Sequence, residues 1–407
     1  MGDIRVVITG AGVVTPAGRG LDNFWANITK GGSFVREIDR FDASRYRSRH
    51  AALVEGFDPG PAFSKRLTKK LDLFSLMSLA ASEDALKSAS IDMAGEDPYR
   101  VGVVFGNALG GWGFAEVELR KLYTHGLREV SPYQATAWFP AAPQGQVSIH
   151  YGIKGFAKTV ISDIASSHLA IACAVRAIRT GRADVVLAGG TEAPVSPYAL
   201  LCLNSSGELS HKGAYMPFDR RRDGYVVGEG AAVLVVEEYG RAVARGANIL
   251  AEVKGFGHTS DGADPVAPLE SGDGMERAMR IALRSANVEP AGLDYLIPAC
   301  NGGVLSDRAE SNAVNRVFGE SIGDVAVGMI KPLIGNTLGA SGAIDAALGC
   351  LAIQNGVAPR GAICEDPIDG AGWVNGGAGV EKNIKRVMIN SMGRGGVHAC
   401  LILERPA

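Results

Sequence analysis

The chain has 407 residues, a formal net charge of −2 and an apolar content of 46%. At about 150 residues per domain, this length predicts two to three units around a large core. The near-neutral charge, without a basic stripe or an acidic tail, argues against nucleic-acid binding and against disorder. The longest apolar runs, such as 231–236, are far shorter than the ~20 residues of a membrane span, so no membrane contact is expected.

The spacing of cysteines and histidines argues against disulfides and metal sites. Six cysteines are scattered without CxxC spacing, and seven histidines show no metal-ligand spacing. We therefore expect free thiols in a reducing cytoplasm and no metal. The chain enters an apolar strand at 4–8, which argues against a secretory signal. The following turn, GAGVV, lacks the third glycine of a dinucleotide loop, and Pro16 blocks a long helix there, so nucleotide binding is not expected.

A helix with an apolar stripe is predicted from Leu67 to Ala89. The start of this helix is basic, which indicates either a solvated face or docking of an acidic partner. The basic residues are Lys65, Arg66, Lys69 and Lys70. A strand at 101–105 and a glycine-rich turn come next, followed by a helix from about Trp112 to Tyr123 on which Trp112, Ala115 and Leu119 share one face.

The stretch 158–192 is the one around which the chain is organised. A β-branched strand at 158–162 leads into an alanine-rich helix at about 165–179, with Ser162 and Asp163 as expected N-cap residues. A helix so poor in charge belongs between other layers, so its first turn lies near the centre of the molecule. The positive helix end would activate a cysteine there. This chain instead has Ile164, which offers no nucleophile, acid or base.

The same pattern begins again after residue 250. Strands are predicted at 249–255, 295–298 and 325–330, with helices at 273–286 and 338–354. The last of these helices is again rich in alanine. The likeness indicates two similar α/β halves, residues 1–250 and 251–407.

Four segments in order carry a family resemblance: VVITGAGVVTP, ADVVLAGGTEAP, PFDRRRDGYVVGEGA and NSMGRGGVHA. Together they resemble the β-ketoacyl-acyl-carrier-protein synthase family over about residues 4–404. The resemblance implies an α/β fold, a duplicated thiolase-like αβαβα five-layer sandwich, with dimer-forming and capping insertions in the first half. It also implies no resident cofactor, because phosphopantetheine would arrive on the acyl carrier protein.

Condensing members of that family use one cysteine and two histidines. The resemblance places Ile164 at the cysteine, Cys300 at the first histidine and Asn336 at the second, and it keeps the family lysine as Lys331. The segment around Cys300 is one residue short, so that placement could shift by one. Loss of all three groups resembles the chain-length factor, or ketosynthase β subunit, of type II polyketide synthases, although chain-length factors commonly have glutamine where Ile164 stands.

This resemblance implies a non-condensing subunit that forms a heterodimer with an active ketosynthase α subunit. It would shape the acyl tunnel and control chain length while malonyl units are added from the acyl carrier protein. The tunnel residues would be Trp112, Phe114, Ala115 and Leu119, with plain core packing as the alternative. The interface residues would be Trp138, Phe139, Thr159, Val160, Ile161 and Ser162.

The charged groups near the degenerate site form a separate expectation. Arg394 stands where the family's glycine-rich loop carries an aromatic gate, and Asp163 adjoins Ile164. Because a charge near a buried site must be paired or hydrated, we expect Arg394 or Lys331 to point into the site and pair with Asp163 or Glu310. A surface arginine in a mobile loop is the alternative.

The sequence is also compatible with two other functions, one of which is enzymatic, so whether the chain is itself an enzyme is undecided at this point. A β-ketoacyl synthase or acyltransferase with a non-standard centre would need Ser166 or Ser167 as nucleophile, yet a serine needs a base and Asn336 cannot accept a proton. A homodimeric binding protein for an acyl chain is the third possibility.

Overall fold

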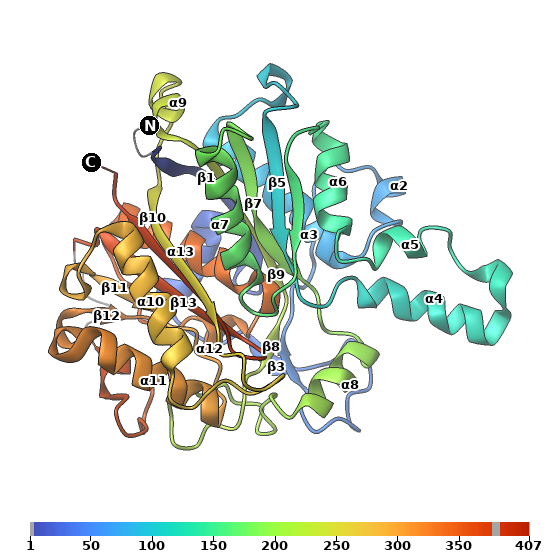
Figure 1. The fold of residues 1–407 in the computed structure, drawn as a ribbon. Coiled ribbons are helices and arrows are strands. Elements are labelled where there is room, and N and C mark those ends of the chain that lie inside the picture. Colours follow the sequence, from blue (N-terminus) through green and yellow to red (C-terminus); the bar gives the residue numbers. More distant parts are fainter. Residues whose placement is uncertain (1–3, 377–382, 407) are drawn as a thin grey trace.

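The computed structural model describes residues 4–376 and 383–406. Its main sheet has eleven strands in one continuous mixed arrangement. The two halves of the chain meet where β1 (Val6–Thr15) pairs antiparallel with β10 (Ala251–Ser260), with Val7 opposite Glu252. Figure 1 shows the resulting arrangement, with blue-to-green elements on one side of this seam and orange-to-red elements on the other.

The first half of the sheet extends from β1 to a free edge. Its strands, in order, are β9 (Gly230–Glu238), β7 (Val185–Glu192), β5 (Val101–Gly106) and β6 (Ala157–Val160). β5, β6 and β7 run parallel, as a buried α/β sheet requires. One side of this half is covered by α3 (Leu73–Ala89) and α6 (Ala142–Tyr151), and the other by α7 (Ser166–Arg179).

The second half repeats this plan beyond β10. Its strands are β14 (Val397–Glu404), β13 (Arg386–Gly393), β11 (Tyr295–Ile297) and β12 (Ala326–Val327). α10 (Asp273–Ala286) and α11 (Val304–Phe318) lie on the outside, and α13 (Ser341–Asn355) lies on the inside. The amphipathic pattern of α10 and the apolar, alanine-rich sequence of α13 account for these two positions.

The two inner helices, α7 and α13, pack against each other and form the middle layer. Small residues allow this close approach. A Cβ on Gly342 of α13 would lie 2.0 Å from the His168 ring of α7. The approach of α7 to the sheet is equally close, since a Cβ on Gly106 of β5 would lie 2.4 Å from the Ser166 carbonyl carbon. The layer order is therefore helix, sheet, helix, sheet, helix, which confirms the predicted duplicated thiolase-like αβαβα sandwich (Figure 1).

Further helices and strands surround this core. They are α1 (Leu21–Lys30), α2 (Lys65–Thr68), α4 (Trp112–His125), α5 (Gln134–Ala137), α8 (Pro197–Ser206), α9 (Tyr239–Ala244), α12 (Lys331–Ile334), β2 (Gly18–Arg19), β3 (Val35–Glu37), β4 (His50–Ala52) and β8 (Val227–Gly228). In Figure 1, α4 projects from the body of the molecule. Within the described ranges, we find neither a helix long and apolar enough to cross a membrane nor a cluster of three or more possible metal ligands.

Two local predictions were wrong. The helix predicted from Leu67 begins only at Leu73, because the Asp72 side chain caps it by accepting a hydrogen bond from the Phe74 N–H at 3.1 Å. Ser162 and Asp163 do not cap α7, whose N-cap residue is Ala165 with no side-chain hydrogen bond. Asp163 instead adopts a left-handed backbone conformation, with φ of 51°.

Candidate functional site

Ile164 lies in the turn between β6 and α7, at the centre predicted for it. The side chain is 3% exposed and belongs to an apolar cluster with Leu200, Leu203, Tyr225 and Leu338. The position that the resemblance assigns to the family cysteine is therefore occupied by a packed hydrocarbon side chain.

A cavity of about 370 Å³ opens beside Ile164. Its wall is assembled from Ile164 and from five other stretches of both halves, which lie far apart in the sequence. Asn301, Met392 and Arg394 contribute to this wall together with Glu208 at the end of α8. We call this space the Ile164 cavity.

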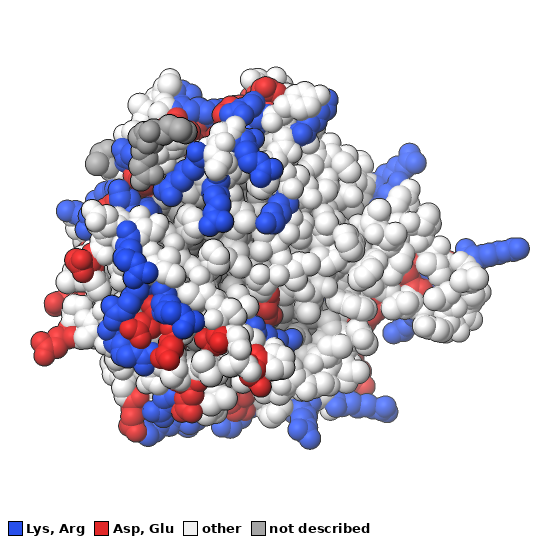
Figure 2. Space-filling model, in the orientation of Figure 1, with Lys and Arg blue, Asp and Glu red and all other residues white. Residues whose placement is uncertain are grey.

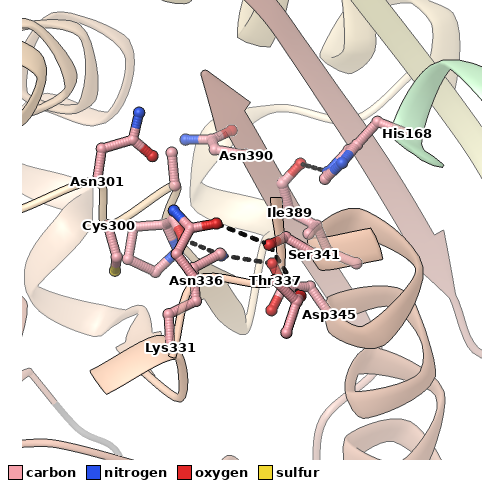
Figure 3. Close-up of polar contacts among 12 residues, drawn as sticks. His168, Cys300, Asn301, Lys331, Asn336, Thr337, Ser341, Asp345, Ile389 and Asn390 are labelled. Carbon is pink, nitrogen blue, oxygen red and sulfur yellow. Dashed lines mark hydrogen bonds and ion pairs between the residues drawn. The ribbon is translucent and has the colours of Figure 1, made fainter. Parts of the chain in front are cut away.

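Cys300, which the resemblance assigns to the first histidine, and its neighbour Asn301 lie in different surroundings. Cys300 is buried with φ of 53°, packs in the apolar core of the second half, and does not line the Ile164 cavity. Asn301 does line it, and its side-chain amide donates to the Met392 carbonyl at 2.8 Å. Figure 3 shows the Cys300 sulfur and the Asn301 amide pointing in opposite directions. Burial holds the pKa of the Cys300 thiol well above its usual range, so it remains protonated.

Asn336, at the second histidine position, is fully buried in a chain of hydrogen bonds. Its side-chain oxygen accepts from the Leu338 N–H at 2.9 Å and from the Ser341 hydroxyl at 3.1 Å (Figure 3). Its Nδ2 donates to the Tyr215 hydroxyl at 3.4 Å, and that hydroxyl donates to the Cys300 carbonyl at 2.5 Å. Amide and phenol groups satisfy one another here, and none of them accepts a proton near neutral pH.

Lys331 is buried and forms no ion pair with Asp163 or Glu310. Its ammonium pairs with Asp345 of α13 at 2.5 Å and donates to the Pro298 carbonyl at 3.2 Å. Glu310 accepts instead from the backbone N–H groups of Ala299 and Cys300. The expectation that Lys331 would serve the degenerate site was therefore wrong, because a closer carboxylate on α13 already neutralises it.

Arg394 does line the Ile164 cavity, but its partner is not the predicted one. The guanidinium Nε contacts the Glu208 carboxylate at 2.5 Å. Asp163 is contacted only through the Arg394 backbone N–H, which donates to Oδ2 at 2.8 Å. Sequence reasoning missed Glu208 because it lies 186 positions from Arg394, and nothing in the local pattern joins the two.

Among the described residues, the serine hydroxyls that line this cavity donate to backbone carbonyls and not to a base: Ser206 to Leu203 at 2.7 Å and Ser306 to Gly303 at 3.3 Å. The Ser167 hydroxyl accepts from the Ala343 N–H at 3.0 Å, inside the contact between α7 and α13. His168 is buried, and burial lowers its pKa to about 3, so it is a neutral packing residue, 3.3 Å from the Ile389 carbonyl (Figure 3). The contact between Ser48 and His211, at 3.2 Å, lies outside the lining of the Ile164 cavity.

The four predicted tunnel residues occupy different environments on α4. The Trp112 ring packs 4.7 Å from Tyr198 and 6.2 Å from Trp138, measured between ring centroids. Ala115 is buried, and Leu119 is 37% exposed. Phe114 lines a separate cavity of about 760 Å³ at the base of the α4 projection, together with residues that include Leu73 and Val195. The structure therefore does not place all four around one cavity of this chain.

The predicted interface residues lie at or near the free edge of the main sheet. Among the described strands, β6 pairs only with β5, which leaves the other edge of Thr159 and Val160 open. Ile161 is 59% exposed, Phe139 52% and Trp138 36%, while Ser162 is half-buried. Figure 2 shows that the surface reaching from the middle of the molecule to the α4 projection is almost free of charge. Its role as an interface stays a prediction.

Comparison with known proteins defines the family. The N-terminal domain of β-ketoacyl synthases matches residues 3–242, and the C-terminal domain matches residues 250–364. The chain belongs to the β-ketoacyl synthase family. This synthase-family chain is 34% identical to a 3-oxoacyl-[acyl-carrier-protein] synthase 2 of Staphylococcus aureus, over 99% of both sequences.

Two solved structures are similar to this β-ketoacyl synthase family member over its whole length. The ishigamide ketosynthase/chain length factor has a TM-score of 0.91 at 28% identity, and each chain is covered completely. A type II polyketide synthase acyl-carrier protein in complex with its ketosynthase bound to the hexaketide has a TM-score of 0.88 at 26% identity, again with complete coverage of both.

Proposed function

We propose that this β-ketoacyl synthase family member is a non-condensing subunit of a type II polyketide synthase, which forms a heterodimer with an active ketosynthase and sets the length of the chain that the pair makes. One observation carries the proposal. The resemblance assigns Ile164 to the nucleophile, Cys300 to the first histidine and Asn336 to the second. Ile164 is packed in an apolar cluster, Cys300 lies in the core away from the cavity with only the amide of its neighbour Asn301 facing it, and Asn336 offers an amide.

The observation matters because condensation requires specific reactive groups. A condensing centre needs a thiolate to hold the acyl chain and proton acceptors to assist at the malonyl group. General acid–base assistance alone is worth roughly 10²–10⁴-fold. Asn301 and Asn336 cannot exchange a proton near neutral pH, and the Cys300 thiol is buried away from the Ile164 cavity.

The Arg394–Glu208 pair supports the same proposal. Both side chains line the Ile164 cavity, and their contact at 2.5 Å joins the glycine-rich turn after β13 to the end of α8. This contact would narrow the space open to an acyl chain beside Ile164. A shape-defining role does not require a chain to enter here.

The relatives support two candidates to different degrees. The similar structures include one described as a ketosynthase/chain length factor, which supports the proposal. The 34% identity to a synthase favours the second candidate, a synthase or acyltransferase with a non-standard centre. That candidate requires a nucleophile beside a base, and the lining of the Ile164 cavity includes no histidine and no cysteine among the described residues.

Chain length would be set by the helix face that bears Trp112. Rings of Tyr198 and Trp138 hold the indole in place, so it can act as a firm wall for a tunnel that continues from the partner, while Ala115 leaves local space. The growing chain would be delivered as a thioester on the phosphopantetheine arm of the acyl carrier protein. This subunit would need no cofactor of its own.

The test is the product length of the reconstituted pair. Trp112→Gly removes the wall and should lengthen the product, and Trp112→Phe should leave the length nearly unchanged. Tyr123→Leu, at an 83% exposed position near the end of α4, is the matched control on the same helix. Product masses identical to wild type in a Trp112→Gly complex that is intact and active would refute the chain-length role.

A further inference from the structure

Three exposed cations surround the exposed side of α7: Lys158 on β6, and Arg176 and Arg182 on and just after α7. We call them the α7 cations. None of the ion pairs found among the described residues includes any of the three. Since the whole chain carries a net charge of −2, this cluster does not follow from a generally basic composition.

Neighbouring side chains hold the α7 cations in defined positions. The Arg182 guanidinium lies 4.4 Å from the centroid of the Phe156 ring, and that of Arg176 lies 5.9 Å from the centroid of Phe256. The Lys158 ammonium lies 3.9 Å from the Cys173 sulfur on α7. Cations stacked on aromatic rings are partly ordered before any partner arrives, which lowers the entropic cost of binding.

The α7 cations border the surface that a partner subunit would cover. Figure 2 shows Lys and Arg gathered over α7, next to the wide uncharged surface that extends toward α4. Lys158 itself lies on the free edge strand, and Ile161, 59% exposed, follows one residue after that strand ends. Charges at the rim of an apolar interface influence the choice of partner more than the total affinity.

We infer that the α7 cations select a partner subunit that carries carboxylates at the facing positions, and that they disfavour pairing with a second copy of this chain. The inference rests on the proposed heterodimer and adds to it the charge that the ketosynthase must present. Its physical basis is symmetry, because in a two-fold homodimer the same surface patch meets itself.

The edge strand makes the repulsion hard to avoid. β6 has four residues. Paired strands lie about 4.8 Å apart and rise about 3.3 Å per residue. If β6 pairs antiparallel with β6 of a second copy, the two Lys158 Cα atoms therefore lie within about 14 Å of each other. Flexible side chains of like charge then share one region at the rim of the interface. A partner with Asp or Glu there would convert this repulsion into attraction.

The first test is self-association of the purified full chain, measured by sedimentation velocity. Wild type should remain monomeric at about 0.01 M ionic strength, where charges interact over about 30 Å, and should dimerise more at about 1 M, where the range is about 3 Å. Lys158→Gln/Arg176→Gln should dimerise at least about tenfold more tightly at low ionic strength. Lys30→Gln/Arg284→Gln, two exposed cations elsewhere, should behave like wild type.

The second test reverses the charges. Lys158→Glu/Arg176→Glu should stay monomeric alone and should form mixed dimers with the wild-type chain at low ionic strength. A wild-type dimer that is equally tight at both ionic strengths, or neutral and reversed variants indistinguishable from wild type, would overturn the inference. Failure of the proposed function is separate, because it would show as condensation by the isolated chain whatever its oligomeric state.

Discussion

The first turn of α7 and the projecting α4 differ in almost every physical respect. Around Ile164, apolar side chains are buried, and Asn336 and Tyr215 hydrogen-bond to each other and to backbone groups. Along α4 and the turn after it, large apolar side chains face outward, with Tyr123 83% and Leu127 82% exposed. Monomeric proteins rarely leave a large contiguous apolar surface uncovered.

This difference is what the proposed role requires of the two regions. In the interior, Ile164 packs beside a cavity whose described lining residues include no cysteine and no histidine. The exterior keeps apolar surface whose exposure costs free energy unless something covers it. A subunit that works by being covered, rather than by reacting, fits both regions at once.

The largest effect is expected at the buried Lys331–Asp345 pair, which tests how firmly the interior is closed. Lys331→Met leaves Asp345 charged and unpaired, so it should cost about 3–5 kcal/mol of unfolding free energy in urea titrations. Lys331→Met/Asp345→Leu removes both charges and should recover most of the loss. A single variant as stable as wild type would show that the pair contributes little.

His168 gives a pH-dependent test of the same interior. Its pKa falls from 6.5 to about 3 in the folded chain because burial penalises the charged ring. The unfolded chain therefore binds a proton that the folded chain excludes, so this contribution is complete above pH 6.5 and is lost as the pH falls toward 3. At pH 5 the loss is about 2 kcal/mol.

Thermal or urea unfolding at several pH values measures this loss. His168→Gln should lose less stability between pH 7.5 and pH 5 than wild type does, by about 2 kcal/mol. Parallel curves for the two proteins would mean that His168 is already hydrated or protonated in the folded state.

The Arg394–Glu208 pair offers a third, smaller test at the boundary between interior and exterior. Ile164→Cys places a thiol at the cavity as a reporter. If the pair restricts entry, Arg394→Ala in that background should raise the rate of alkylation by iodoacetamide about tenfold, and Arg394→Lys should raise it less. An unchanged rate would show that the ion pair does not restrict access. Neither variant should gain condensing activity, because no base is restored.

The smallest effect is expected at the basic residues near α2. Lys65, Arg66 and Lys69 are exposed, and the Lys70 ammonium lies 4.3 Å from the centroid of the Tyr133 ring. If the carrier protein docks mainly on the ketosynthase, Lys65→Ala/Arg66→Ala should raise the KM for the carrier less than about twofold, as expected for exposed charges. A tenfold rise would instead place carrier docking on this subunit.

Much of the architecture could be predicted from the sequence because it depends on local pattern. The alanine-rich helix was predicted at 165–179 and observed at 166–179, and the amphipathic helix was predicted and observed at 273–286. The residues that determine whether such a helix forms lie within the helix itself, so its position can be predicted from local sequence. The turn at 162–165 was mispredicted, because Asp163 in a left-handed conformation replaces a side-chain cap with the contact to the Arg394 backbone.

The site could be predicted less completely, for a physical reason. The identity of Ile164 and Asn336 is visible in the sequence, but their surroundings are contributed by distant segments. Tyr215 joins Asn336 to Cys300, and Glu208 pairs with Arg394, across separations of 85 to 186 residues. Asn301 and not Cys300 faces the cavity, and the left-handed backbone at Cys300, with φ of 53°, is not visible in sequence periodicity.

Condensation by the isolated chain distinguishes a shape-defining subunit from an enzyme. The purified chain is incubated with malonyl- and acyl-carrier protein, alone and together with an active ketosynthase that co-purifies with it, and condensation product is quantified by mass spectrometry. The proposal predicts no product and no covalent acyl adduct from the chain alone, and product from the pair. Turnover by this chain by itself, at a rate comparable to that of the pair, would contradict it.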